Sequence, residues 1–96
     1  MKIEWDKKKN VLNVKKHGLS FDEAKEVFND PQLLEFFDAA HSSAEEDRYI
    51  GLGSIRGVLI VVVVFHDRKG RIRIISARKA NQREREVYFE HIRRTN

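Results

Sequence analysis

The sequence predicts a single α+β domain over residues 1–96, with an antiparallel sheet of three to four strands flanked by two N-terminal helices and one C-terminal helix. Two observations predict it. Helix-start and helix-stop signals lie before residue 32 and after residue 80, whereas the chain between them has short apolar runs separated by turn residues. Short hairpin connections of this kind favour antiparallel neighbours.

The chain begins with a segment, Lys2 to Trp5, that is compatible with a short strand. Asp6 then suits the N-cap of a helix ending at His17, and Gly18 suits the left-handed residue that follows a helix. We therefore expect the first helix between Asp6 and His17.

The second N-terminal helix has clearer end signals. Ser20 and Glu23 have the spacing of a capping box, and Leu19 and Ala24 suit a hydrophobic staple. The sequence Asn29-Asp30-Pro31 then stops the helix.

The middle of the chain predicts strands. The unbroken Val/Ile run implies a central strand that is covered on both faces. The expected order is a strand at 33–37, a loop at 38–47, a strand at 48–53, a turn at 54–57, the central strand at 58–65, a turn at 67–70, a strand at 71–77 and a helix at 81–94.

Composition excludes several classes of protein. The chain has no cysteine, and its histidines at 17, 41, 66 and 91 lack metal-ligand spacing, so we expect no metal site and no cofactor. The longest apolar run has eight residues, far short of the ~20 that a membrane-spanning helix needs. The N-terminus also lacks the apolar region of a signal peptide, so we expect a cytoplasmic protein without a membrane partner.

Charge is segregated along the chain. Residues 71–96 carry a net charge of +5 and residues 1–18 one of +4, whereas residues 19–65 carry −6. A fold that brings the two ends together would create one positive face, which is typical of nucleic-acid binders. Basic side chains scattered over a solvated surface are the alternative.

The segment from Arg71 to Ala77 predicts a strand that carries arginines. Strict alternation places Arg71 and Arg73 on one face and Ser76 on the other. The planar guanidinium suits bidentate contacts with phosphate. Alternatively, Arg71 is a solvated strand residue and Arg73 pairs with a carboxylate such as Glu84.

The junction between this strand and the last helix predicts a second anion site. Arg78 and Lys79 lie there, and helix N-terminal amides favour negative charge. The spacing of Asn81 and Glu84 is also that of a capping box, so the segment could serve only to start the helix. Tyr88 could be a proton donor, a base-stacking ring or a core aromatic residue.

Three further residues are candidates from outside this segment. Lys16 and His17 close the first helix, where the helix dipole alone favours a cation, although Lys or His near arginines also suits acid–base chemistry on RNA. Arg48 follows the acidic run Glu45 to Asp47, and a salt bridge to that run is its simpler explanation.

Several motifs together resemble the BrnT family of toxins from bacterial type II toxin–antitoxin systems. The resemblance covers nearly the whole chain and is weakest between residues 32 and 45. Lys7 replaces a proline that the family often has after its Trp-Asp pair. In chain order, the matching residues are Trp5-Asp6, Lys9, Asn13, Lys16-His17-Gly18, Phe21 with Ala24, Phe28 with Asp30, Arg48-Tyr49 with Gly53, and Arg71 to Ala80 followed by Glu84 and Tyr88.

The resemblance implies a RelE-like ribonuclease fold, metal-independent cleavage of RNA, and a small cognate antitoxin that neutralises the toxin. It also implies that operator DNA is bound only through the toxin–antitoxin complex. The family positions carried over are Lys16, His17, Arg48, Arg73, Ser76, Arg78, Glu84 and Tyr88. We expect Lys16, His17, Arg48, Arg73, Arg78, Glu84 and Tyr88 to be catalytic, and Arg71, Ser76 and Lys79 to bind RNA.

We expect the RNA 2′-hydroxyl to attack the adjacent phosphate and leave a cyclic phosphate. Arg73 and Arg78, with Arg48, would stabilise charge on the phosphoryl oxygens. The proton carriers stay open among Lys16, His17, Glu84 and Tyr88. Two other functions also stay open: a non-catalytic module that binds nucleic acid with strong salt dependence, and a basic docking surface for an acidic partner.

Overall fold

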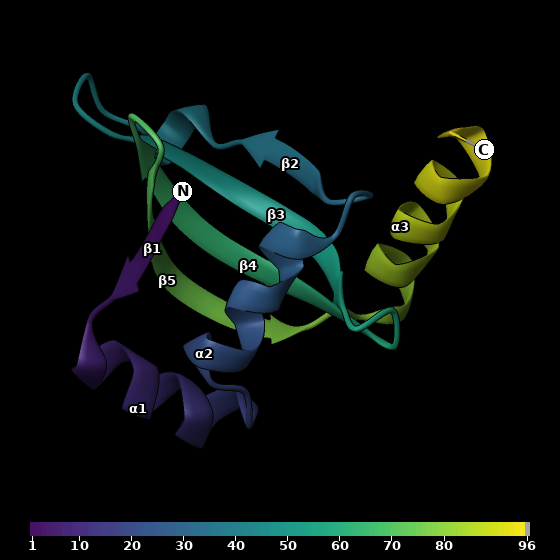
Figure 1. Ribbon diagram of the computed structural model, residues 1–96, viewed down its shortest axis with the longest axis horizontal. Coiled ribbons are helices and arrows are strands. Elements are labelled where there is room, and N and C mark those ends of the chain that lie inside the picture. Colours follow the sequence, from purple (N-terminus) through teal and green to yellow (C-terminus); the bar gives the residue numbers. More distant parts are fainter. Residues whose placement is uncertain (96) are drawn as a thin grey trace.

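The computed structural model of this chain describes residues 1–95, so Asn96, the last residue of the predicted domain, lies outside the described residues. Helices pack on both faces of a single sheet (Figure 1). The elements are β1 (Lys2–Trp5), α1 (Lys7–His17), α2 (Phe21–Ala24), the 3₁₀ helix η1 (Lys25–Asn29), β2 (Leu34–Phe37), the 3₁₀ helix η2 (Ala39–His41), β3 (Asp47–Ile55), β4 (Leu59–Arg68), β5 (Arg71–Lys79) and α3 (Gln82–Thr95).

The sheet corrects the predicted architecture. It has five strands in the order β1-β5-β4-β3-β2, and β1 runs parallel to β5, so the sheet is mixed rather than antiparallel with three to four strands. Hairpin rules concern strands that follow one another, whereas β1 and β5 lie at opposite ends of the chain. The parallel pair satisfies backbone groups along the first half of β5, which would otherwise be an open edge.

The second predicted helix is also wrong in its extent. Only Phe21–Ala24 is α-helical, and the chain then tightens into η1, so one helix lies at each end of the chain and only a short one between. Phe21, Ala24 and Val27 are all completely buried. Their spacing of three residues explains the tightening, because a 3₁₀ helix has three residues per turn and aligns such side chains along one line.

The predicted helix ends are confirmed. The Asp6 carboxylate accepts hydrogen bonds from the amides of Lys8 and Lys9, and Gly18 follows α1 in the left-handed conformation with φ 68°. Ser20 and Glu23 form the expected capping box. These local signals fix where the helices begin and end, whereas packing determines the course of the chain between them.

The core has two parts, one on each face of the sheet. We call the face toward the viewer in Figure 1, on which α2 and η1 pack, the front face, and the opposite face the back face. The front face buries Val61, Val63 and Phe65 of β4, whereas the back face buries Val62 with Tyr88 of α3. The Val/Ile run is thus a central strand covered on both faces, as predicted.

A β-bulge in β5 corrects the predicted alternation of side chains. Ile74 pairs with Phe65 but Ser76 pairs with Val64, so Ile75 is an extra residue. Each residue beyond Ile75 therefore changes face. Ile72, Ile74 and Ala77 are buried in the front core. The back face consequently receives Arg71, Arg73, Ser76 and Arg78.

Asn13 joins α1 to β5 where β1 stops. Its side-chain amide donates to the carbonyl of Ala77 at 2.8 Å and to that of Leu19 at 2.8 Å, and its carbonyl accepts from the Ala77 amide at 3.1 Å. β1 pairs with β5 only as far as Ile74. The buried Asn13 side chain thus takes over the hydrogen bonds of a missing strand residue.

The end of the back face next to α3 is fixed by Asp30. Its Oδ2 accepts hydrogen bonds from the Tyr88 hydroxyl at 2.6 Å and from the Ser54 amide at 2.8 Å. Burial raises the pKa of Asp30, but the hydrogen bonds from Tyr88, Ser54 and Gln32 outweigh it, so that its pKa is lowered. Burial and the hydrogen bond to Asp30 raise the pKa of Tyr88.

We predict that Asn13→Ala lowers the free energy of unfolding by about 2–4 kcal/mol, because it leaves buried backbone groups of Ala77 and Leu19 without partners. Urea denaturation measures the change. The control is Leu12→Ala on the same helix, where the side chain is 63% exposed and we expect a change within about 0.5 kcal/mol. Equal effects of the two substitutions would contradict the role of Asn13.

We predict that Tyr88→Phe lowers the free energy of unfolding at neutral pH by about 1.5–3 kcal/mol, because Asp30 loses a charged hydrogen bond. Since the folded-state pKa of Asp30 is lowered, its contribution is fully present above the unfolded-state value and is lost as pH falls through the folded-state value. Denaturation between about pH 5 and pH 2 should therefore show a shallower loss of stability in Asp30→Asn than in the wild type. As a control, Asp22 is an exposed carboxylate on α2, and Asp22→Asn should lose stability with falling pH as steeply as the wild type does.

Candidate active site on the back face of the sheet

The site lies on the part of the back face that α3 leaves open. α3 packs over the end formed by Leu52, Ile60 and Val62. At the other end, Arg48 of β3 pairs with His66 of β4, and His66 pairs with Arg73 of β5. Directly opposite residues on antiparallel strands have Cβ atoms roughly 4.5–5.5 Å apart. Arg48, His66 and Arg73, which we call the basic row, therefore lie side by side across three strands.

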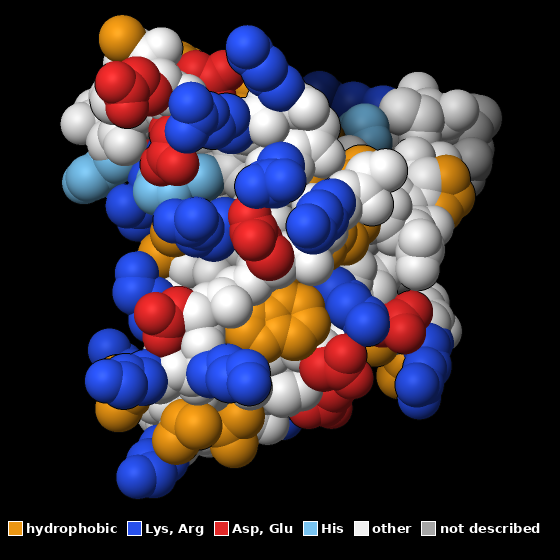
Figure 2. Space-filling view, turned by 60° about the vertical axis from the view of Figure 1, so that its left-hand side comes forward, with side chains coloured by type: hydrophobic (Ala, Val, Ile, Leu, Met, Phe, Trp, Pro, Cys, Tyr) orange, Lys and Arg blue, Asp and Glu red, His pale blue; other side chains and the backbone are white. Residues whose placement is uncertain are grey.

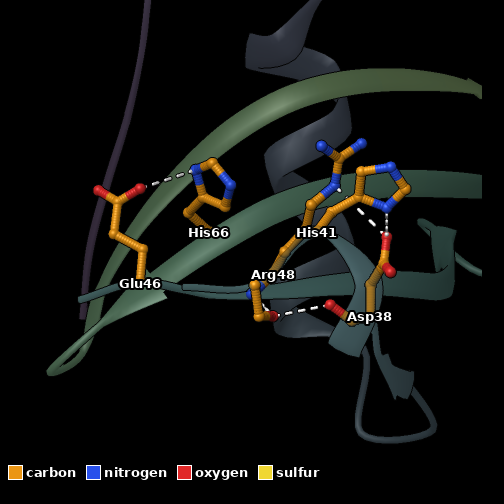
Figure 3. Close-up of polar contacts among 6 residues, drawn as sticks. Asp38, His41, Glu46, Arg48 and His66 are labelled. Atoms are coloured by element: carbon orange, nitrogen blue, oxygen red, sulfur yellow. Dashed lines mark hydrogen bonds and ion pairs between the residues drawn. The ribbon is translucent and has the colours of Figure 1, made fainter. Parts of the chain in front are cut away.

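Arg48 is anchored but keeps donors free. Its Nε lies 3.6 Å from Oδ2 of Asp38 and is buried without a hydrogen-bond partner. The two terminal nitrogens of its guanidinium point away from Asp38 (Figure 3). The simpler explanation of Arg48, a salt bridge to residues 45–47, is wrong, because Arg48 turns toward Asp38, which also binds His41 Nδ1 at 2.9 Å.

His66 is the member of the basic row that no sequence motif indicated. Its Nδ1 lies 3.2 Å from Oε2 of Glu46, and its side chain is 21% exposed. The hairpin register could have found it, because a turn centred on Gly57 brings residue 48 opposite residue 66. The spacing of histidines along the chain gave no such signal.

The Arg73 side chain is exposed to solvent. Among residues 1–95 this side chain makes no hydrogen bond or ion pair, and Glu84 pairs with Arg78, so the alternative explanation of Arg73 as a partner of Glu84 is wrong. Its neighbour on β1, Glu4, lies 3.8 Å from Nε of Arg71 instead. Arg71 shares the back face with Arg73 by strand alternation, and the bulge adds Ser76 to this face.

Arg78 and Glu84 form a bidentate ion pair. Two parallel hydrogen bonds of 2.8 Å join the guanidinium to the carboxylate. The bond to Glu84 raises the pKa of Arg78, and the bond to Arg78 lowers the pKa of Glu84. Glu84 also accepts from the Asn81 amide and completes the predicted capping box of α3.

The remaining candidates lie apart from the basic row. Tyr88 is 3% exposed and holds α3 through Asp30. Lys16 and His17 end α1 at the edge of β5, and no hydrogen bond or ion pair in the described chain joins them to the basic row. The register places Lys79 opposite Val61 and therefore on the front face.

Basic segments from the two ends of the chain come together in the fold. β1 pairs with β5, and α1 packs on β5, so residues 1–18 lie beside residues 71–79. Lys and Arg side chains cover much of the surface on this side of the molecule, with carboxylates between them (Figure 2). A polyanion would meet a largely positive surface here.

Two further observations concern metals and membranes. Within residues 1–95, no three His, Asp or Glu side chains are grouped so that they could hold a metal ion. None of the helices described is both long and apolar enough to cross a membrane.

Comparison with known proteins identifies the family. Residues 5–84 match the model of the ribonuclease toxin BrnT of type II toxin–antitoxin systems. A solved relative is the Brucella abortus ribonuclease toxin BrnT, with 29% sequence identity, a TM-score of 0.64, and coverage of 85% of this chain and 99% of that chain. No curated protein sequence matches.

The family match confirms the resemblance seen in the sequence and sets aside the alternative of a non-catalytic module. Membership of this family also implies an RNA substrate and an antitoxin partner. The matched segment runs from Trp5, the last residue of β1, to Glu84 in the first turn of α3, and it contains the whole basic row. Because it covers most of the sequence, the chain belongs to the BrnT family of ribonuclease toxins of type II toxin–antitoxin systems.

Proposed function

We propose that this toxin binds RNA across the basic row and cleaves it without a metal ion, by attack of the 2′-hydroxyl on the adjacent phosphate. One observation carries the proposal: Arg48 and Arg73 flank a histidine on an open sheet face. Within residues 1–95, the terminal guanidinium nitrogens of Arg48 and the whole guanidinium of Arg73 have no hydrogen-bond partner. Guanidinium groups bind phosphate oxygens in bidentate fashion and stabilise the charge that develops there.

The two arginines have different tasks in this proposal. Arg48 is held by Asp38 and is 28% exposed, so it is preorganised for one phosphate orientation. Arg73 is exposed and adjusts to the bound strand. Preorganised donors aimed at a developing charge usually contribute the largest single part of catalysis.

The other predicted residues take supporting positions in the proposal. Arg71 and Ser76 extend phosphate binding along the back face, and Lys79, Lys16 and His17 contact the RNA where it passes the β5 edge. Arg78 contributes positive charge while it stays bound to Glu84. We assign Glu84 and Tyr88 to holding α3, because their polar atoms already have strong partners.

We predict that Arg73→Ala and Arg48→Ala each lower kcat/KM for RNA cleavage about 100-fold or more, because one donor to the developing charge is lost. Cleavage of a labelled RNA, with analysis for 2′,3′-cyclic phosphate ends, measures this. The control is Arg83→Ala on the exposed side of α3, which should retain wild-type activity. The assay should be unaffected by EDTA, and loss of activity in EDTA or full activity of Arg73→Ala would contradict the proposal.

We further propose that the toxin acts in the cytoplasm and that its antitoxin covers the basic row when it neutralises the enzyme. We also propose that operator DNA is bound only through the toxin–antitoxin complex. We expect an electrophoretic shift of operator DNA with the co-purified complex and none with toxin alone at the same salt concentration. A specific shift by free toxin would contradict this division.

A further inference from the structure

The cleavage needs a proton acceptor at the basic row, and the predicted acceptors are not available there. Glu84 accepts two bonds from Arg78 and one from the Asn81 amide. Tyr88 is buried and donates to Asp30. Lys16 and His17 end a helix at the edge of the sheet.

His66 has the position that these residues lack. It lies opposite Arg48 on one side and opposite Arg73 on the other, so a phosphate bound by both arginines would lie over its ring. Its side chain is 21% exposed, which leaves the ring accessible while the sheet holds it.

Glu46 sets the protonation pattern of the His66 ring. Nδ1 of His66 lies 3.2 Å from Glu46 Oε2, and a carboxylate beside this nitrogen favours the neutral tautomer that carries its proton on Nδ1. Nε2 then bears the free lone pair, and it lies on the side of the ring away from Glu46 (Figure 3). This is the tautomer that a general base requires.

The loop that carries Glu46 is itself ordered by hydrogen bonds. The Ser43 amide donates to the Glu46 carbonyl at 2.9 Å, and the Glu46 amide donates to the Ser43 hydroxyl at 3.2 Å. These reciprocal bonds hold Glu46 beside the start of β3. Glu46 thus contacts His66, the central residue of the basic row.

We propose that His66 is the catalytic base of RNA cleavage and that Glu46 is its positioning residue. This inference rests on the proposed function. His66 Nε2 takes the proton of the 2′-hydroxyl as the bond from O2′ to phosphorus forms. The bond from phosphorus to O5′ breaks, O5′ takes a proton from water, and a 2′,3′-cyclic phosphate remains.

The test compares His66→Ala with His91→Ala, which removes a histidine on α3. His66→Ala should lower kcat about 100-fold or more, the range typical of general base catalysis, whereas His91→Ala should retain wild-type activity. Added imidazole should restore part of the activity of His66→Ala and should not accelerate the wild type. Thermal unfolding establishes that both variants fold.

Glu46→Gln provides a separate readout. Because it keeps the shape of the side chain but removes the charge that orients His66, we expect kcat to fall about tenfold, the low end for a partner that orients a functional histidine, with KM unchanged. For His66→Ala, a further readout is the pH profile of kcat/KM, which should have one titration step fewer than the profile of the wild type.

The outcomes separate the two proposals. If Arg48→Ala and Arg73→Ala lose cleavage while folded His66→Ala keeps it, the basic row is the site but His66 is not the base. If folded His66→Ala loses cleavage and imidazole restores none, its proton-carrying role is overturned. If the arginine variants all keep full activity, the proposed function and this inference both fail.

Discussion

The extra residue in β5 is the constraint on which the two faces of this molecule depend. Before Ile75, the odd-numbered residues of β5 point to the back face, and after it the even-numbered ones do. The front core thereby keeps Ile72, Ile74 and Ala77 without a charged interruption. The back face collects polar side chains from both halves of the strand. A regular strand of the same sequence would bury Ser76 among apolar residues and separate Ser76 and Arg78 from Arg71 and Arg73.

Polar residues in this fold form two groups. In the first group the side chains already have hydrogen-bond partners inside the protein, and in the second some donors or acceptors have no such partner. Asn13, Asp30, Glu84 and Tyr88 have short hydrogen bonds inside the protein and hold α1 and α3 to the sheet. Arg48, His66 and Arg73 keep donors or acceptors that face solvent. A family motif contains residues of both groups, so its match alone does not distinguish a residue that holds the fold from one that contacts RNA.

Local signals predicted much of the fold and the family, and non-local pairing accounts for what they missed. Asp6, Gly18, the Ser20–Glu23 box and the Asn81–Glu84 box act within a few residues, so the sequence displays them directly. The parallel pairing of β1 with β5 joins the two ends of the chain and has no local signature. The bulge at Ile75 and the 3₁₀ turn at Val27 are set by packing against the front core. The sequence around His66 gives no signal for this residue, because its position depends on its two cross-strand neighbours, Arg48 and Arg73.

The parallel pairing of β1 with β5 also has a consequence for synthesis of the protein. β1 is synthesised first but cannot pair until β5 has been synthesised, since it pairs only with Arg71 to Ile74. A nascent chain therefore lacks both the closed edge and one third of the basic row until β5 has left the ribosome. Contacts between such distant segments also slow folding, because loop closure costs entropy before the contacts form. An enzyme that degrades RNA is thus assembled only after its last strand, β5, has been translated.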